Sequence, residues 1–350
     1  MSRDRMLAIL PPIAAVGFSL VVSGLVLLAS GANPFEAVAN MVSYGVRSNT
    51  LVETVNWATP LYLSAIAVAI GFRMNLFNIG VEGQYIIAAF MAAQVGAVVS
   101  LPPVLHVGLI ILTAMVVGAF WAGLAGLMKV TRNVHEVIST IMLNGIAVGG
   151  IVSYLLGVWD VEDAGLDTAL GDIPQSGWFP SLSPVLDLFG VETRSELWGF
   201  VLVAVVVGFG YHFMLNRTRL GFDLRASGMN PAAAEASGVD PKRTIVIAML
   251  LSGLVAGLVG LPELLGNSHA YSLRFTQGLG FAGIAVAALL FGWLSRASGI
   301  LEVRGDAPRE IVSIIQGVII LSVVVAYSVA ERYRRVEAAK AAAALVGEAR

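Results

Sequence analysis

VLHVGLIILTAMVVGAFWAGLAGLM, residues 104–128, contains no Asp, Glu, Lys or Arg. As a helix rising about 1.5 Å per residue, this stretch is long enough to cross a hydrocarbon core of about 30 Å. A segment in lipid must be helical, because no water is present to satisfy its open backbone groups. The stretch therefore predicts a transmembrane helix.

The rest of the chain repeats this pattern. Charged residues make up 13% of the 350 residues, whereas soluble domains carry about 25%. The charges lie in short clusters between long apolar stretches. The fold expected is an all-α, polytopic transmembrane helical bundle. About nine spans of the required length are predicted, at 7–30, 51–72, 79–100, 104–128, 134–158, 197–215, 244–265, 279–294 and 310–330.

Two segments near the N-terminus need separate interpretation. The run 7–30 follows two arginines, as in a signal peptide. It is longer than the apolar region of about 7–15 residues in a cleavable signal, so we expect it to be retained as the first span. Segment 33–48 is short and amphipathic and is expected at the membrane interface. Asn33 and Pro34 are typical of a helix start.

Charge bias predicts the orientation. The loop 216–243 carries five Lys and Arg residues, and the loop 159–196 carries eight acidic residues with Arg194 as its only basic one. Because positive charge favours the cytoplasmic side, the first is expected to be a cytoplasmic coupling loop and the second an external loop. Both place the N-terminus in the cytoplasm, in agreement with Arg3 and Arg5.

The number of spans conflicts with the C-terminal charge. An odd number of crossings would put the tail 331–350 outside, yet it opens with ERYRR, which favours the cytoplasm. The short, glycine-containing segment near 279–294 is therefore expected to be broken or re-entrant, giving about 9–10 spans. Residues 1–330 would form one transmembrane domain, followed by a cytoplasmic tail.

The most informative polar stretch is GFRMNLFNIGVEGQ, residues 71–84. It places Asn75, Asn78, Glu82 and Gln84 at or just inside the membrane boundary. Inserting a carboxylate within a span costs about 2.5–3.5 kcal/mol. These four side chains are candidates for a substrate path. Alternatively the stretch is a structural turn in which Glu82 pairs with Arg73, or it serves both roles.

A second polar stripe lies on the fifth predicted span. Glu136, Ser139, Thr140 and Asn144 fall on one helical face. Glu136 and Asn144 are further substrate-path candidates. Ser139 and Thr140 more readily hold helices together through hydrogen bonds.

The loop LRASGMNPAAAEASGV, residues 224–239, predicts one short helix of about two turns. Asn230 suits the N-cap, Pro231 the first helical position and Gly238 the C′ position. Such a helix is either a docking element for a partner or a plain connection.

Several functions are disfavoured by what is missing from the sequence. No Gly-Lys dipeptide is present, so there is no Walker A loop, and neither a G-x-S-x-G elbow nor an H-E-x-x-H pair occurs. The chain has no cysteine, and its four histidines lack ligand spacing. The net charge of −2 argues against a nucleic-acid partner. We therefore expect no catalytic residue, no metal, no cofactor and no ATPase activity of the chain itself.

At 71–84, 133–144 (NVHEVISTIMLN) and 224–239 the sequence resembles the permease subunits of ATP-binding-cassette importers for nucleosides, simple sugars and branched-chain amino acids. GLGFAGIAVA (278–287) and IVSIIQGVIIL (311–321) add to the resemblance, and FNIGVEGQ is similar to the nucleoside branch. Family members continue GIAVA with a short polar turn, whereas here Ala287 is followed directly by Ala288. That turn is either lost from this protein or omitted from the chain.

The resemblance implies a multi-pass permease of the plasma or inner membrane that works by alternating access. Its partners would be an ABC ATPase subunit, a second permease that is a paralogue, and an extracellular substrate-binding lipoprotein. Loop 224–239 would be the coupling helix, with contact and capping residues at Asn230, Pro231, Ala233, Glu235 and Gly238. The alternative cargoes are a simple sugar or a branched-chain amino acid. The alternative class is an ion-coupled secondary transporter using Glu82 or Glu136.

Overall fold

The computed structural model describes residues 17–18, 20–29, 31–159, 168–272 and 275–282, and it divides into two compact units, 1–50 with 293–350 and 51–292. In the first unit, helix Leu20–Ala29 and helix α2 (Pro34–Gly45) are bent by 111°. The side-chain oxygen of Asn33 accepts a hydrogen bond from the Phe35 N–H at 3.0 Å. The predicted helix start at Asn33 and Pro34 is confirmed.

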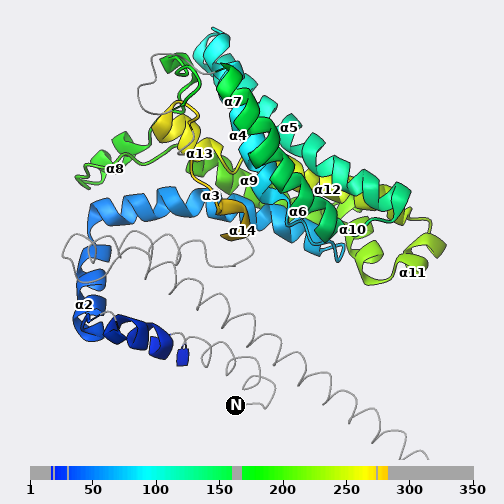
Figure 1. The fold of residues 1–350 in the computed structure, drawn as a ribbon, viewed down its shortest axis with the longest axis horizontal. Coiled ribbons are helices and arrows are strands. Elements are labelled where there is room, and N and C mark those ends of the chain that lie inside the picture. Colours follow the sequence, from blue (N-terminus) through cyan, green and yellow to red (C-terminus); the bar gives the residue numbers. More distant parts are fainter. Residues whose placement is uncertain (1–16, 19, 30, 160–167, 273–274, 283–350) are drawn as a thin grey trace, which may run out of the picture. The chain divides into compact units, whose positions relative to one another are not determined.

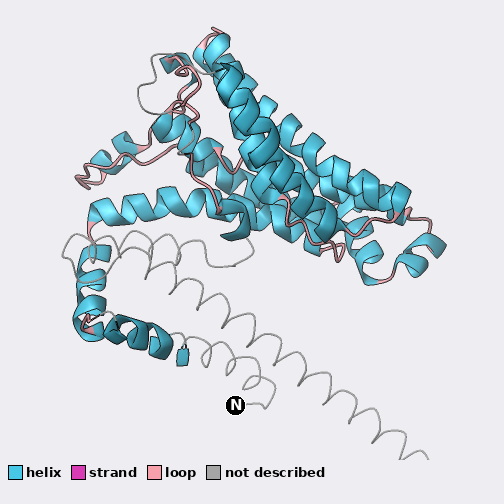
Figure 2. Ribbon diagram, in the orientation of Figure 1, coloured by secondary structure: helices cyan, strands magenta, loops and turns pink. Residues whose placement is uncertain are grey.

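The second unit is a bundle of long apolar helices (Figures 1 and 2). Its spans are formed by α3 (Ser48–Phe72), α4 (Val81–Val98), α5 (Pro103–Arg132), α6 (Glu136–Gly145), α7 (Ser153–Trp159), α9 (Phe200–Arg217), α12 (Pro241–Gly257) and α13 (Leu261–Glu263). Two of these spans change helix type along their length. Helix α6 continues through a π-helical stretch, Ile146–Val152, into α7, and α12 continues into α13 and a second π-helical stretch, Leu264–Ser268.

The all-α fold is confirmed. Within the described ranges, 6 helices are long and apolar enough to cross a membrane, or up to 7 with the bent pair. They match the predicted spans at 51–72, 79–100, 104–128, 134–158, 197–215 and 244–265. No β-strand occurs in the part of the chain that is described, only two isolated bridges, Ala169–Ser272 and Ser181–Trp198.

Three of the predicted segments fall wholly or partly outside the described residues. The first span, 7–30, is described at residues 17–18 and 20–29. Of 279–294 only α14 (Leu279–Ala282) is described, so the junction of Ala287 and Ala288 is not. The span 310–330 and the tail 331–350 lie outside the described residues altogether.

Helices α5 and α12 pack through glycines. A Cβ added to Gly118 would meet the carbonyl oxygen of Gly253 and lie 2.8 Å from the Cα of Gly257. A Cβ added to Gly253 would in turn meet the Gly118 carbonyl and the Ala122 methyl group. These two small-residue faces therefore bring the backbones into direct contact, which is the usual way in which membrane helices gain packing energy.

The connecting segments gather at opposite ends of the second unit. At one end, near α8 (Ser183–Leu188) and α13, the segment 168–179 bonds to 265–272, with the Ile173 N–H donating to the His269 carbonyl at 2.8 Å. At the other end lie α10 (Arg219–Met229) and α11 (Pro231–Ala236) (Figure 1). The described part of the acidic loop, 168–196, and the basic loop 216–243 thus lie at opposite ends of the bundle.

Candidate transport and coupling site

The turn after α3 is closed by Asn75. The Leu76 N–H donates to the Gly71 carbonyl at 3.0 Å and the Asn75 N–H to the Phe72 carbonyl at 3.1 Å. This is a Schellman motif, whose C′ residue has a left-handed backbone, and Asn75 has φ +53°. Its side chain is exposed and its Nδ2 donates to the Gly228 carbonyl, 2.7 Å away at the end of α10.

Asn78 and Gln84 form a buried amide cluster. Asn78 Nδ2 donates to Gln84 Oε1 at 3.0 Å, and Gln84 Nε2 donates back to Asn78 Oδ1 at 2.9 Å. Asn78 Nδ2 also lies 2.8 Å from Ser252 Oγ, which donates to the Ala67 carbonyl at 2.6 Å. The cluster thus joins α3, α4 and α12, and it leaves both amides almost fully covered, at 1% exposure.

Glu82 holds the start of α14. Its Oε1 accepts from the Gly278 N–H at 2.6 Å and its Oε2 from the Gly280 N–H at 2.9 Å. Tyr85 Oη lies 3.1 Å from the same carboxylate and 2.9 Å from the Thr276 carbonyl. Because the first N–H groups of a helix lack intrahelical partners, the carboxylate serves as an N-terminal cap supplied by a different helix.

The alternative ion pair between Glu82 and Arg73 is not formed. Arg73 is exposed, and its Nε lies 3.4 Å from Tyr211 Oη on α9. Backbone N–H groups replace the guanidinium as donors to Glu82. A Cβ on Gly280 would meet the Glu82 backbone, so only glycine allows this close approach.

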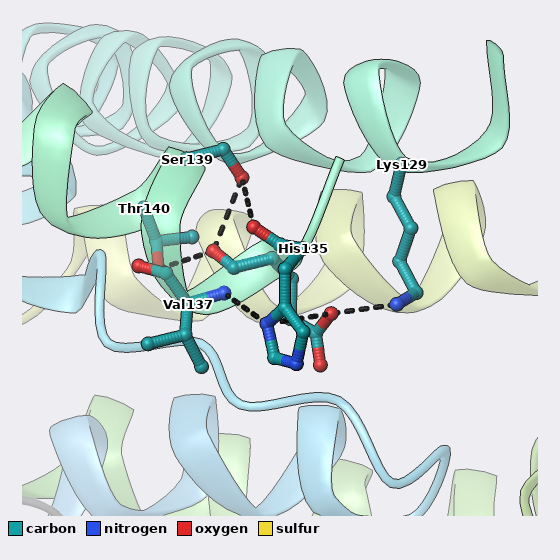
Figure 3. A network of polar contacts seen from close by, with 6 residues as sticks. Lys129, His135, Val137, Ser139 and Thr140 are labelled. Atoms are coloured by element: carbon teal, nitrogen blue, oxygen red, sulfur yellow. Dashed lines mark hydrogen bonds and ion pairs between the residues drawn. The ribbon is translucent and has the colours of Figure 1, made fainter. Parts of the chain in front are cut away.

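The polar stripe on α6 is also engaged in local contacts (Figure 3). Glu136 is buried and its Oε2 lies 2.6 Å from Lys129 Nζ. The hydroxyl groups of Ser139 and Thr140 donate to the Glu136 carbonyl at 3.1 and 2.7 Å. His135 Nδ1 also lies 3.6 Å from Glu136 Oε2, and the same nitrogen lies 3.3 Å from the Val137 backbone nitrogen. The ion pair of Glu136 is with Lys129.

Asn144 joins the two polar motifs. Its Oδ1 accepts from the Gly83 N–H and its Nδ2 donates to the Ile79 carbonyl, both at 2.9 Å. Gly83 is one of the first residues of α4, so Asn144 satisfies an N–H that the helix itself leaves open. Motifs 71–84 and 133–144 therefore meet in the fold, as residues of one site must.

The short helix predicted within 224–239 is present as α11, but the loop 216–243 contains a second helix, α10, that was not predicted. Thr218 begins α10, its Oγ1 accepting from the Gly221 N–H at 3.1 Å. The buried positions of α10 are Gly221, Leu224 and Ser227, which share one face. Two of these three residues are small, so the buried face gives a weak hydrophobic signal, which explains why the helix was not predicted.

The predicted caps of α11 are confirmed. Asn230 Oδ1 accepts from the Ala233 N–H at 3.1 Å, and Pro231 is the first helical residue. Gly238 has φ +83° and its N–H donates to the Glu235 carbonyl at 2.9 Å. Ala234 is the buried residue of this helix. A shallow hollow on its outer side is lined by Pro231, Ala232, Glu235, Gly238, Val239, Asp240, Pro241 and Lys242.

Sequence reasoning missed the partners that complete the site. Tyr85, Gly278 and Gly280 bind or flank Glu82, and Ser252 binds Asn78. Lys129 offered a signal, because Lys129 and Arg132 are the two Lys or Arg residues shortly before Glu136 in a chain with few charges. The glycines act through their backbone, which a side-chain pattern does not reveal. In the described part of the chain no group of three or more His, Cys, Asp or Glu residues could hold a metal.

Comparison with known proteins gives consistent matches. The family described as the permease component of the branched-chain amino acid transport system matches residues 50–330. The chain is 33% identical to the guanosine ABC transporter permease protein NupP of Bacillus subtilis (strain 168), covering 93% of this chain and 95% of NupP. It is 27% identical to the nucleoside ABC transporter permease protein NupB of Lactococcus lactis subsp. cremoris, covering 96% of each chain.

A third relative has a different cargo in its name. The glucose ABC transporter permease protein TsgB13 of Haloferax volcanii is 30% identical over 89% of this chain and 85% of its own length. No solved structure matches the chain. The family match covers the motifs at 71–84, 133–144 and 224–239, which lie in the site described above. The chain is therefore a multi-pass membrane protein that belongs to the family of permease components of branched-chain amino acid transport systems.

Proposed function

We propose that this chain is the membrane-spanning permease subunit of an ATP-driven importer of nucleosides. Two of the relatives reported above are named for guanosine or nucleoside transport, and both match over nearly the whole chain. The motif FNIGVEGQ, residues 77–84, is the part of the sequence that resembles this branch. The cell membrane would be its location, with the N-terminus and the loop 216–243 on the cytoplasmic side and the loop 159–196 outside.

The observation that carries this proposal is the display of α11 at one end of the bundle. The helix is capped at both ends by its own sequence, and the side chains of Pro231, Ala233 and Glu235 are exposed. A helix of 6 residues is too short to be stable alone, so its two caps preserve a shape that a partner can bind. An ATPase subunit is the partner that the family resemblance implies for this element.

The remaining partners follow from the same reasoning. A second permease, a paralogue of this chain, would complete the path, and an extracellular lipoprotein would deliver the substrate. ATP-driven movement of α11 in each permease would open the path to one side at a time.

The polar residues would form the framework beside that path. Asn78, Gln84 and Asn144 bond to neighbouring helices, and Glu82 caps α14. Glu136 is paired with Lys129. These contacts support a framework role in the conformation described, and an exchange of partners during transport would be needed for them to face the substrate.

Reconstitution tests the proposal. Proteoliposomes containing the chain with its co-purified subunits should take up labelled guanosine when ATP is enclosed on the side of α11, and not without ATP. Uptake by the chain alone, or uptake driven by a proton gradient without ATP, would show a secondary transporter instead.

Two arginine substitutions distinguish docking from general damage. Ala232→Arg places a charged side chain in the hollow beside α11 and should abolish both ATPase co-purification and uptake. Phe189→Arg changes a residue that is 75% exposed at the other end of the bundle, and it should leave the ATPase bound. Normal ATPase binding by Ala232→Arg would contradict the docking role of α11.

A simple sugar is the second candidate cargo, because TsgB13 is named for glucose. Competition separates the two. Excess unlabelled glucose should leave guanosine uptake unchanged if the cargo is a nucleoside, and glucose uptake itself should then be at background.

A further inference from the structure

Asn75 occupies a position at which glycine is usual. It is the C′ residue of the Schellman motif that ends α3, with φ +53°. Glycine adopts this left-handed conformation without steric cost, whereas asparagine tolerates it less well. Leu76, the next residue, is 2% exposed and anchors the turn in the bundle. Asn133 has the same backbone conformation, so the conformation alone does not distinguish Asn75, and its side-chain contact does.

The side chain of Asn75 reaches the end of α10. Its Nδ2 donates to the Gly228 carbonyl at 2.7 Å, across 153 residues of sequence. Gly228 lies directly against the turn: a Cβ on it would meet the Arg73 carbonyl and lie 3.0 Å from the Cα of Met74. Two residues after Gly228, Asn230 begins α11. The turn after α3 is therefore in direct contact with the residues that lead into α11.

The same turn is bonded to the core on its other side. Asn78, three residues after Asn75, bonds to Ser252 on α12 and to Gln84 on α4. Arg73 lies 3.4 Å from Tyr211 on α9. A short chain of hydrogen bonds and backbone contacts thus connects the α10–α11 junction to α4 and α12. The amide of Asn75 makes the hydrogen bond between this turn and α10.

We propose that Asn75 is a positioning residue that transmits movement of α11 to the turn at the start of α4. The proposal rests on the proposed function, in which a partner ATPase moves α11. Asn75 touches neither ATP nor the transported molecule in this role. Its amide keeps the turn attached to the Gly228 carbonyl when the loop is displaced, so that ATP hydrolysis and opening of the path remain linked.

Asn75→Gly is the variant that isolates this contact. Glycine suits the left-handed backbone better than asparagine does, so the turn keeps its shape and loses only the hydrogen bond. The matched control is Asn133→Gly. Asn133 ends α5 with the same φ of +53°, and its side chain makes no hydrogen bond to any other described residue.

The measurement is uptake of guanosine per ATP hydrolysed in the reconstituted complex. Asn75→Gly should retain ATPase subunits and ATP hydrolysis, while the ratio of uptake to hydrolysis falls about fivefold, the factor expected for loss of one hydrogen bond of ordinary strength. Asn133→Gly should keep the wild-type ratio. Asn75→Asp, which keeps the size of the side chain but presents an acceptor to the Gly228 carbonyl, should lower the ratio at least as far.

Two failures are distinguishable. If the wild-type complex shows no ATP-driven uptake, the proposed function is wrong and this proposal falls with it. If the wild type transports and either Asn75 variant assembles with a wild-type ratio, only the role of Asn75 is refuted. A purely structural cap would lower the amount of folded complex and leave the ratio unchanged, which also refutes the proposal.

Discussion

Replacing Asn144 with leucine removes two hydrogen bonds between α6 and the start of α4 while nearly preserving the size of the side chain. The Gly83 N–H loses its acceptor and the Ile79 carbonyl loses its donor, each at 2.9 Å in the native protein. Neither group gains a new partner from leucine. The change therefore tests whether Asn144 stabilises the junction of the two polar motifs.

The magnitude follows from these two groups. Hydrogen bonds between helices in membrane proteins contribute about 0.6 kcal/mol on average and up to about 1.7, so two average bonds give about 1.2 kcal/mol. The Gly83 N–H has no intrahelical acceptor, and a buried polar group without a partner costs about 1–3 kcal/mol. We expect Asn144→Leu to lower the free energy of unfolding by about 2–3 kcal/mol.

Equilibrium unfolding in mixed micelles, followed by fluorescence, measures this difference. Ser153→Ala is the control, because Ser153 bonds to the Val148 carbonyl on an exposed surface of the same span and its loss should cost less than about 0.5 kcal/mol. If Asn144→Leu also changes the free energy of unfolding by less than about 0.5 kcal/mol, Asn144 does not stabilise the junction of the two polar motifs and the reasoning is refuted.

Gly118→Ala should lower the free energy of unfolding by about 1–3 kcal/mol, because its methyl group meets a carbonyl of α12; Gly108→Ala on the same helix, with nothing within 4 Å, should not, and equal effects would refute this packing argument. Glu82→Gln should impair uptake strongly, although glutamine has a shape similar to that of glutamate. The NH2 group of glutamine would face a backbone N–H that in the native protein donates to a carboxylate oxygen. Transport at the wild-type rate would show that the cap is dispensable. Burial lowers the pKa of His269 below its usual 6.5, although two nearby carboxylates act in the opposite direction. As the pH falls, the unfolded loop therefore binds a proton before the folded loop does. The contribution of His269 to the stability of the loop is present above pH 6.5 and is lost as the pH falls below it. The fluorescence of Trp178, stacked on His269 at 3.8 Å, should change in that acidic range and not above pH 6.5.

Apolar length and helix capping were sufficient to predict much of the fold. The described spans coincide with long runs of apolar residues, because the bilayer demands one helix for each. The caps of α11 were also predictable, since Asn230, Pro231 and Gly238 act on their own immediate backbone. Such local signals depend on a few neighbouring residues and need no knowledge of the rest of the chain.

The partners of the polar residues could not be predicted in the same way. Glu82 bonds to N–H groups 196 and 198 residues away, and every non-proline residue offers an N–H, so the sequence does not single out these two. An ion pair with Arg73 was the nearest alternative in sequence and was wrong. The stripe on α6 was predictable as a face, but its contacts with Gly83 and Ile79 depend on how two helices cross.

The glycine contact between α5 and α12 restricts how the bundle can rearrange. Where Gly118 meets Gly253 and Gly257, no side chain separates the two backbones, so one helix cannot slide along the other without driving carbonyl oxygens into Cα atoms. Helices α5 and α12 must therefore move together as one rigid body whenever the protein changes conformation. Hinges are expected where longer side chains separate this pair from neighbouring helices. A disulfide between α5 and α12 would leave the movement of the pair unimpaired.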